Sequence, residues 1–152
     1  MIIDSNMAEN EVILNVAKLM VAAARTAPKA RGEDSIKTAI ITGEDKEKLA
    51  RVMEQMGRTR DAGNVRDAGA VVLVGVECGS SSGEWWPFKA KLIDLGIALG
   101  SAVKVASELN VDNRIMYSVG MAAMKMNIMK ADEIQGIPLS IKGKNIFFDR
   151  KT

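Results

Sequence analysis

The chain has 152 residues but no histidine and only one cysteine, Cys78. The absence of histidine excludes a Ser-His-Asp triad and the usual zinc fingers, and a single cysteine excludes an internal disulfide. Aromatic residues form only 4% of the chain and the net charge is +2, so it lacks the stacking platforms and the basic excess typical of nucleic-acid binding. We therefore expect no polynucleotide partner and no metal site.

Long hydrophobic runs are also absent. A Lys, Asp or Glu interrupts each apolar stretch well before it reaches the length of a bilayer, and the N-terminus has no basic segment followed by an apolar core. Hydrophobic residues make up 47% of the chain and charged residues 26%, an ordinary composition for a globular domain. We expect a single domain over residues 1–152, a cytoplasmic location and no membrane partner.

Helical and extended patterns alternate along the chain without a linker between two domains. The continuous apolar run 70–76 is typical of a central strand covered on both faces, whereas Pro138 favours an edge or a bulge in the last strand. We expect an α+β fold with three α/β/α layers, in which helices flank a small mixed sheet of about three to five strands. The predicted helices are about 7–27, 44–57, 88–109 and 112–127, with a short helix within 58–67, and the predicted strands are 35–42, 70–76 and 133–141.

The helical spacing also predicts which side of each helix is buried. In the last predicted helix, Asp112 or Asn113 is the expected N-cap and Ile115 is expected to face inward. In the first, the predicted buried residues are Val12, Val16, Leu19, Met20 and Ala23.

Two basic loops are candidate anion sites. The first follows the first helix, where Pro28 and Gly32 end the helical pattern and Arg25, Lys29 and Arg31 supply three cations. A helix C-terminus whose basic residues are simply solvated is the alternative. The second candidate is the turn Lys142-Gly143-Lys144, because the glycine lets the backbone approach an anion between two lysines. Here too a solvated turn is the alternative.

The long helix Phe88–Leu109 has an unusual pair of small residues. Gly96 and Gly100 lie one turn apart, and each glycine costs a helix interior about 1 kcal/mol relative to alanine. Close approach of another backbone, from a neighbouring helix or from the same helix of a second subunit, would compensate for that cost. We therefore expect a homodimer that forms through this helix.

The segment between the central strand and the long helix is rich in glycine and serine and ends in Trp85 and Trp86. We expect it to be a mobile lid. It also contains Cys78, whose use as a reactive thiol is a third functional hypothesis. The chain has no histidine to activate that thiol, and a carboxylate at Glu77 would raise its pKa.

The order of these pieces resembles flavin-dependent nitroreductases. The resemblance rests on Ala23-Ala24-Arg25-Thr26-Ala27-Pro28-Lys29, the strand after them, and Thr42-Gly43-Glu44-Asp45-Lys46-Glu47-Lys48-Leu49. The resemblance implies that the loop after the first helix lies beside FMN. It also implies that 70–76 is the central strand, that 93–109 belongs to a dimer-forming helix, and that 134–140 is the late strand before a glycine turn.

A second resemblance is to an uncharacterised prokaryotic family described as containing a ferredoxin domain (domain of unknown function 2148). Its stretches here are 23–32, 94–103 with 111–117, and 136–140 with 143–150. The family's closely spaced cysteines resemble iron–sulfur ligands, but this chain has Cys78 alone. A four-iron cluster needs about four thiolates. We therefore expect no iron–sulfur cluster in one chain or between two.

Two main functional hypotheses remain, and the sequence identifies no catalytic residue or substrate for either. In the first, a nitroreductase-like protein binds FMN and acts in flavin-dependent redox chemistry, which needs no histidine because the flavin carries the reactivity. Its cofactor-binding candidates are Arg25, Lys29, Arg31, Lys142, Gly143 and Lys144, drawn from one subunit or two. In the second, a non-catalytic homodimer recognises a small anionic metabolite through Arg25, Lys29 and Arg31.

Overall fold

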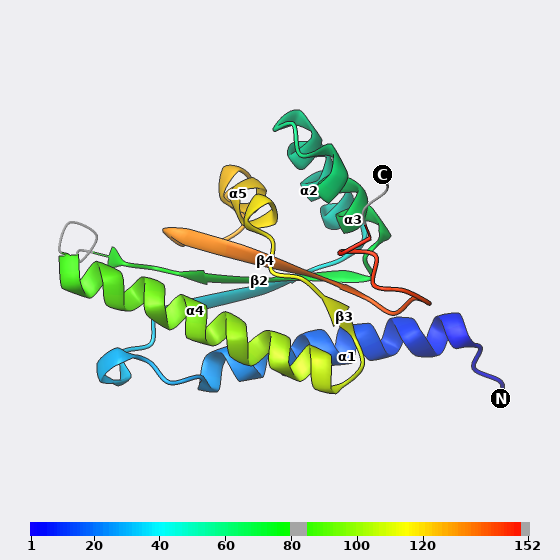
Figure 1. The fold of residues 1–152 in the computed structure, drawn as a ribbon, viewed down its shortest axis with the longest axis horizontal. Coiled ribbons are helices and arrows are strands. Elements are labelled where there is room, and N and C mark those ends of the chain that lie inside the picture. The colour runs from blue at the N-terminus through cyan, green and yellow to red at the C-terminus, as the bar shows by residue number, and fades with distance from the viewer. Residues whose placement is uncertain (80–84, 150–152) are drawn as a thin grey trace.

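A computed structural model describes residues 1–79 and 85–149, without the side chain of Trp85. In these residues one four-stranded sheet has the order β1-β2-β4-β3 (Figure 1). At its centre, Val72 of β2 pairs with Ile40 on one side and with Ile137 on the other. The strands are β1 Ile36–Ile41, β2 Ala70–Val76, β3 Asp112–Asn113 and β4 Glu133–Ser140.

All three strand pairs are antiparallel, so the expected mixed sheet is corrected on this point. The reason lies in the connections between strands. Helices α2 (Gly43–Gln55) and α3 (Thr59–Asp67) pack on each other and return the chain to the end of the sheet that it left. Between β2 and β4 the chain passes through α4 (Trp85–Glu108) on one face and α5 (Tyr117–Lys125) on the other, and it also returns to the end of the sheet that it left (Figure 1).

The expected three layers are confirmed. Helix α1 (Ser5–Thr26) and α4 lie together on one face of the sheet, and α2, α3 and α5 cover the other (Figure 1). Every residue of β2 is buried, as its continuous apolar sequence predicts. The short helix expected within 58–67 is α3. Among the described residues, no helix has both the length and the apolar character needed to cross a membrane.

The buried side of α1 differs in part from the prediction. The helix begins after Asp4, whose carboxylate accepts a hydrogen bond from the Met7 amide at 2.9 Å. Val12 and Leu19 are 41% and 52% exposed rather than buried. Val16 and Met20 are buried as predicted, and Ile13, Ala17 and Ala24 take the other inner positions, because the side of α1 that meets α4 and the sheet is turned toward them. The buried residues are Ile13, Val16, Ala17, Met20 and Ala24.

The predicted start of the last helix is also wrong. Asp112 and Asn113 form β3 by pairing with Ser140 and Leu139, and α5 begins only at Tyr117. Pairing with β4 holds both residues extended, so neither caps the helix. Ile115, expected to face inward, is 40% exposed.

Helix α5 lies directly on the backbone of β4 at two glycines. A Cβ on Gly120 would lie 1.7 Å from the Ile134 carbonyl oxygen, and one on Gly136 would lie 2.1 Å from Cγ1 of Val119. The Met116 amide donates to the Gly136 carbonyl at 2.7 Å and fixes the start of the helix there. Glycine at both positions is therefore a condition for this contact.

Pro138 lies inside the sheet rather than on an edge strand, since β4 runs between β2 and β3. The Gly136 amide points toward Met116, and the nitrogen two residues later points the same way. Pro138 therefore faces the gap in pairing between Asn113 and Met116, where a missing N–H breaks no ladder bond.

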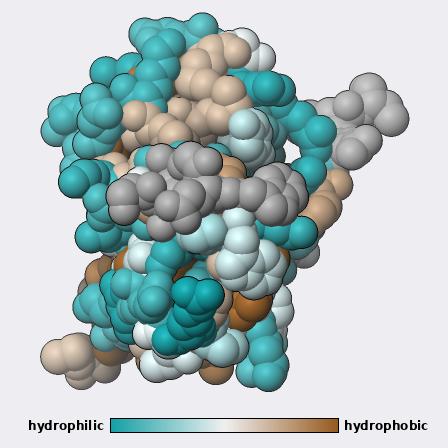
Figure 2. Space-filling model, turned by 90° about the vertical axis from the view of Figure 1, so that its left-hand side faces the viewer, coloured by the Kyte–Doolittle hydropathy of each residue, from teal (hydrophilic) through white to brown (hydrophobic). Residues whose placement is uncertain are grey.

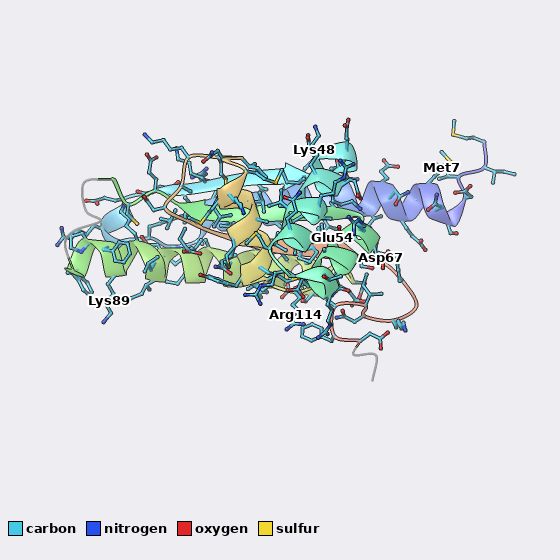
Figure 3. The ribbon with its side chains drawn as sticks, turned by 90° about the horizontal axis from the view of Figure 1, so that it is seen from above. Met7, Lys48, Glu54, Asp67, Lys89 and Arg114 are labelled. Atoms are coloured by element: carbon cyan, nitrogen blue, oxygen red, sulfur yellow. The ribbon has the colours of Figure 1, made fainter. Side chains whose placement is uncertain are left out.

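Residues 80–84 of the predicted lid lie outside the described residues. The tryptophans at its end belong to the first turn of α4, and Trp86 is 55% exposed. Met7 and Lys89 lie toward opposite ends of the molecule, so α1 and α4 begin far apart and run past each other (Figure 3).

Candidate functional site

The loop after α1 is tied to the start of β1 by Arg25. Its Nη1 donates to Asp34 Oδ2 at 2.6 Å and to the Ile36 carbonyl at 2.9 Å. Partial burial acts to raise the pKa of Asp34, but the Arg25 hydrogen bond, the Ile36 amide and the charges of Arg25 and Lys29 hold that pKa below its usual value. Arg25 therefore already has a carboxylate and a carbonyl as partners.

Lys29 caps the C-terminus of α1. Its side chain is only 6% exposed, and its Nζ donates to the carbonyls of Ala24, at 3.0 Å, and Arg25. These carbonyls have no partner within the helix, so the buried ammonium satisfies the helix C-terminus. The solvated end considered as the alternative is instead an internal cap.

Arg31 lies apart from these two residues. It has a left-handed φ of 57° in the turn η1 (Ala30–Gly32), which the buried Asp94 holds by accepting the Ala30 amide hydrogen bond at 3.0 Å. Arg31 lines a small hollow beside Trp86 and Asp94.

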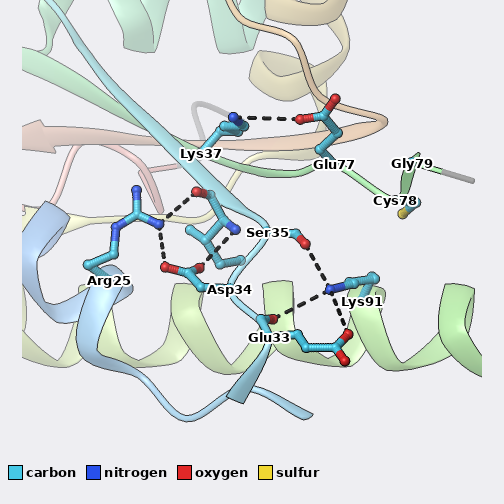
Figure 4. A pocket seen from close by; sticks show the side chains of 10 residues that line it. Arg25, Glu33, Asp34, Ser35, Lys37, Glu77, Cys78, Gly79 and Lys91 are labelled. Carbon is cyan, nitrogen blue, oxygen red and sulfur yellow. Dashed lines mark hydrogen bonds and ion pairs between the residues drawn. The ribbon is translucent and has the colours of Figure 1, made fainter. Parts of the chain in front are cut away.

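An open pocket of about 480 Å³, here called the loop pocket, lies beside Arg25 at the start of β1 (Figure 4). Lys91 of α4 donates to Ser35 Oγ at 2.8 Å and lies 3.9 Å from the Glu33 carboxylate. Lys37 lies 3.5 Å from the Glu77 carboxylate. The cations of this pocket are therefore paired with carboxylates of the same chain.

Cys78 lies at the inner wall of the loop pocket and is 3% exposed. Its backbone N–H donates to Asp132 Oδ2 at 2.6 Å. Burial, followed by the charge of Asp132, raises the pKa of the Cys78 thiol, and Lys91 acts in the opposite direction. The nearby carboxylate that matters is thus Asp132 rather than the expected Glu77, and the thiol lacks the exposure of a reactive cysteine.

A second pocket of about 480 Å³, here called the C-terminal pocket, lies between α3 and the segment after β4. The fully buried Phe147 anchors this segment, and Arg114 donates to its carbonyl at 2.9 Å. The pocket is lined by Thr59, Arg60, Gly63, Asn64, Asp67, Lys144, Ile146 and Asp149.

Two features leave the C-terminal pocket incomplete. Nδ2 of Asn64 is buried without a hydrogen-bond partner among the described residues, a state that calls for a ligand, water or ion. Gly63 lies inside helix α3, yet a Cβ there would meet nothing within 4 Å. The helix therefore carries the cost of a glycine without an internal packing reason, and it keeps space open beside Asn64.

The basic turn contributes to the C-terminal pocket through Lys144, which forms an ion pair with Asp149. Lys142 lies near Lys46, whose Nζ donates to the Arg66 carbonyl at 2.7 Å. Burial lowers the pKa of Lys46, the charges of Asp67 and Glu47 act to raise it, and the charge of Lys142 acts to lower it. Lys46 and Lys144 of this corner thus lie near carboxylates of the same chain.

One chain does not bring the two predicted cation groups together. Arg25 holds the start of β1 at Ile36, which pairs with Val76, whereas Lys142–Lys144 follow β4 at the end where Ser140 pairs with Asp112.

Four residues of these pockets were not predicted as site residues from the sequence: Arg60, Asn64, Lys91 and Asp94. Gly63 was the available signal for the first two, because an internal glycine in a helix of nine residues needs an explanation. No group of three or more Cys, Asp or Glu within 1–79 and 85–149 is arranged to hold a metal.

Solved structures share this arrangement. The hypothetical oxidoreductase YcnD from Bacillus subtilis superposes with a TM-score of 0.67 at 14% identity over 86% of this chain and 58% of its own. A Desulfovibrio desulfuricans protein described as a nitroreductase in complex with FMN gives 0.67 at 14% over 91% and 79%. Nitroreductase A from Vibrio parahaemolyticus gives 0.65 at 11% over 95% and 61%. The fold is nitroreductase-like, and this chain spans less than two thirds of YcnD.

Sequence similarity points to a smaller group of proteins than the fold does. An uncharacterized protein from Archaeoglobus fulgidus is 39% identical over 180 aligned positions, which cover 99% of this chain and 98% of the relative. The pattern of the family described as uncharacterized protein containing a ferredoxin domain (DUF2148) matches residues 88–150. The chain belongs to this family, and both resemblances noted in the sequence are confirmed.

Proposed function

We propose that the protein binds FMN and acts in flavin-dependent redox chemistry, with the flavin held at the C-terminal pocket. The observation that carries the proposal is the buried, unpartnered Nδ2 of Asn64 beside the open space at Gly63. Structural neighbours support it: one is described as a complex with FMN, and another as an NADPH:FMN oxidoreductase from Vibrio harveyi.

The residues of the C-terminal pocket fit an anionic, hydrogen-bonding cofactor. Arg60 has no ion pair or hydrogen bond within the part of the chain that the structure describes, so its guanidinium is available to a phosphate. Lys144, which is paired with Asp149, adds a second cation to the lining, and the Asn64 amide offers a donor that has no partner among the described residues. A pocket of about 480 Å³ also falls within the size range of cofactor sites.

When bound, a flavin supplies the electron-transfer chemistry itself. The chain then has to bind and orient it: Arg60 and Lys144 neutralise its phosphate, Asn64 donates a hydrogen bond, and Gly63 leaves room beside the amide. Asp67 and Asp149 line the same pocket and can accept hydrogen bonds from hydroxyl groups.

The proposal includes a homodimer formed through α4. Gly96 and Gly100 have nothing within 4 Å of an added Cβ, and Leu92, Ile93 and Ile97 beside them are 37%, 47% and 40% exposed. Hydrophobic surface is visible at the level of α1 and α4 in the lower part of Figure 2. A second copy would cover this face and is the route by which Arg25, Lys29 and Arg31 could approach a flavin.

The roles of Arg25, Lys29 and Arg31 as anion ligands stay predictions. Arg25 and Lys29 already donate to Asp34 and to helix carbonyls, so recognition of a metabolite by these residues would require those bonds to be exchanged. Arg31 carries the alternative function best, because no partner for its side chain is found in the described residues.

The test is retention of FMN after incubation and gel filtration, read from the flavin absorption bands. Wild-type protein should retain the chromophore, and Arg60→Ala with Lys144→Ala should lose most of it. Lys125→Ala is the matched control, because Lys125 is an exposed lysine outside both pockets. A wild-type protein that stays colourless would overturn the proposal.

A further inference from the structure

A third pocket, independent of the two described above, lies where α4 ends and β3 begins. It has a volume of about 460 Å³. Its polar lining is rich in amides, and no Lys or Arg among residues 1–79 and 85–149 contributes to it. The residues that matter are Ser107, Asn110, Asp112, Asn113, Asn145 and Phe148.

Phe148 forms one wall of this pocket and is held outward. Its neighbour Phe147 is fully buried, whereas Phe148 is 59% exposed. The Arg114 guanidinium lies 4.9 Å from the centroid of the Phe148 ring and donates to the Phe147 carbonyl at 2.9 Å. Arg114 thus covers one face of the ring by a cation–π contact and leaves the rest of it to the pocket.

Two asparagines beside the ring are fixed by the chain. Nδ2 of Asn113 donates to Ser107 Oγ at 3.1 Å and to the Val111 carbonyl at 3.0 Å, so its Oδ1 remains an acceptor. Oδ1 of Asn145 accepts from the Phe147 amide at 3.1 Å, so its Nδ2 remains a donor. The pocket therefore combines an aromatic platform with one fixed acceptor and one fixed donor.

We propose that this pocket binds an adenine nucleoside, with the base stacked on Phe148 and its edge bonded to Asn113 and Asn145. Adenine presents an amino donor next to a ring-nitrogen acceptor, which matches the free Oδ1 and Nδ2. A base stacks on an aromatic ring through its π-face. Because the lining that the structure describes includes Asp112 and no Lys or Arg, we expect a phosphate to add little to binding here. The proposal does not rest on the flavin.

The experiment is titration of the full chain with adenosine, in which binding is measured by NMR chemical shifts and by calorimetry. We expect a Kd on the order of 0.1–1 mM for adenosine, within about 3-fold the same Kd for AMP, and no binding of ribose. Phe148→Ala should weaken binding by at least about 10-fold. Tyr117→Ala is the matched control, because Tyr117 is an equally exposed aromatic, at 60%, outside this pocket.

Four outcomes would overturn the proposal. Equal binding of ribose would show that no base is recognised, and equal losses in Phe148→Ala and Tyr117→Ala would show that no particular ring is used. If wild type does not bind adenosine and Phe148→Ala changes the molecular mass in solution, the pocket is a contact between two copies of the chain instead of a nucleoside site. The titration is repeated with excess FMN. Competition between FMN and adenosine would place adenosine at the flavin pocket and would overturn the proposal. A protein that stays colourless with FMN but still binds adenosine would support this proposal and contradict the flavin proposal.

Discussion

Gly120 and Gly136 lie in a closed contact between α5 and β4, whereas Gly96 and Gly100 of α4 face open space. An added Cβ would meet the Ile134 carbonyl at Gly120 and Cγ1 of Val119 at Gly136, whereas at Gly96 and Gly100 it would meet no atom of the described residues within 4 Å. The same residue type thus serves two demands, and only the first is met inside the chain. A helix glycine that has no close contact inside the chain therefore suggests a neighbour outside it, and this is why we expect α4 to pack on a second copy.

The largest effect is expected from Gly120→Ala. The new Cβ would lie 1.7 Å from the Ile134 carbonyl oxygen, and because that neighbour is backbone, α5 has to move away from the sheet. We expect the free energy of unfolding to fall by at least about 3 kcal/mol. Urea unfolding measures it, and a loss below about 1 kcal/mol would contradict the closed contact.

Gly136→Ala should be costly but repairable, because its new Cβ would meet a side chain, Cγ1 of Val119, at 2.1 Å. We expect a loss of about 2 kcal/mol in unfolding free energy. Adding Val119→Ala removes the closer clashing atom but leaves the Val119 Cβ, which lies 2.6 Å from the new Cβ. The double variant should therefore recover part of the loss and be more stable than the two single losses predict. Strict additivity in urea unfolding would show that the two residues do not meet.

The open pair should respond in the opposite direction. Gly96→Ala and Gly100→Ala meet no atom of the chain, so each should stabilise the monomer by about 0.5–1 kcal/mol through helix propensity. If α4 packs on a second copy, the same variants should weaken the dimer. Sedimentation over a range of concentrations separates the two effects, and a wild-type protein that is monomeric at all of them would contradict the dimer.

The smallest effect concerns the loop that joins α1 to β1, which is held by charge rather than by close packing. The folded-state pKa of Asp34 lies below the ordinary value of 3.8, so its stabilisation is present above that pH and is lost as the pH falls through the folded pKa. Because the side chain is 34% exposed, we expect a few tenths of a kcal/mol at neutral pH.

The measurement for Asp34 is urea unfolding of wild type and Asp34→Asn at several pH values. The stability gap should be constant above about pH 5 and close below about pH 3. A gap that persists in acid would show that the Arg25 bond to this carboxylate is not its origin.

The sequence predicts most of the fold because its elements carry strong local signals. The run 70–76 becomes β2 without adjustment, and the helices differ by a few residues at their ends. The failures concern choices that depend on a partner. Val12 and Ile13 fit the same helical spacing, and only the position of α4 and the sheet decides that Ile13 is buried. Asp112 is a good cap in isolation, but pairing with Ser140 makes it a strand.

The candidate site is less predictable for the same reason. The cations of both basic loops are visible in the sequence, but the separation of Arg25 from Lys144 follows from the sheet, which places them at opposite ends. Lys29 resembles a surface lysine until the carbonyls of α1 are seen around it. Asn64 is ordinary in sequence, and only burial shows that its amide lacks a partner.

The gap in pairing beside Pro138 has a consequence for how copies of this chain avoid one another. The outer side of β4 is covered by the chain's own residues 112–116, because Asn113 faces Leu139 and Met116 faces Gly136 in one register. A foreign strand therefore cannot reach the Pro138 nitrogen. The edge left on this side of the sheet is β3, which at two residues is too short to serve as a template for edge-to-edge aggregation.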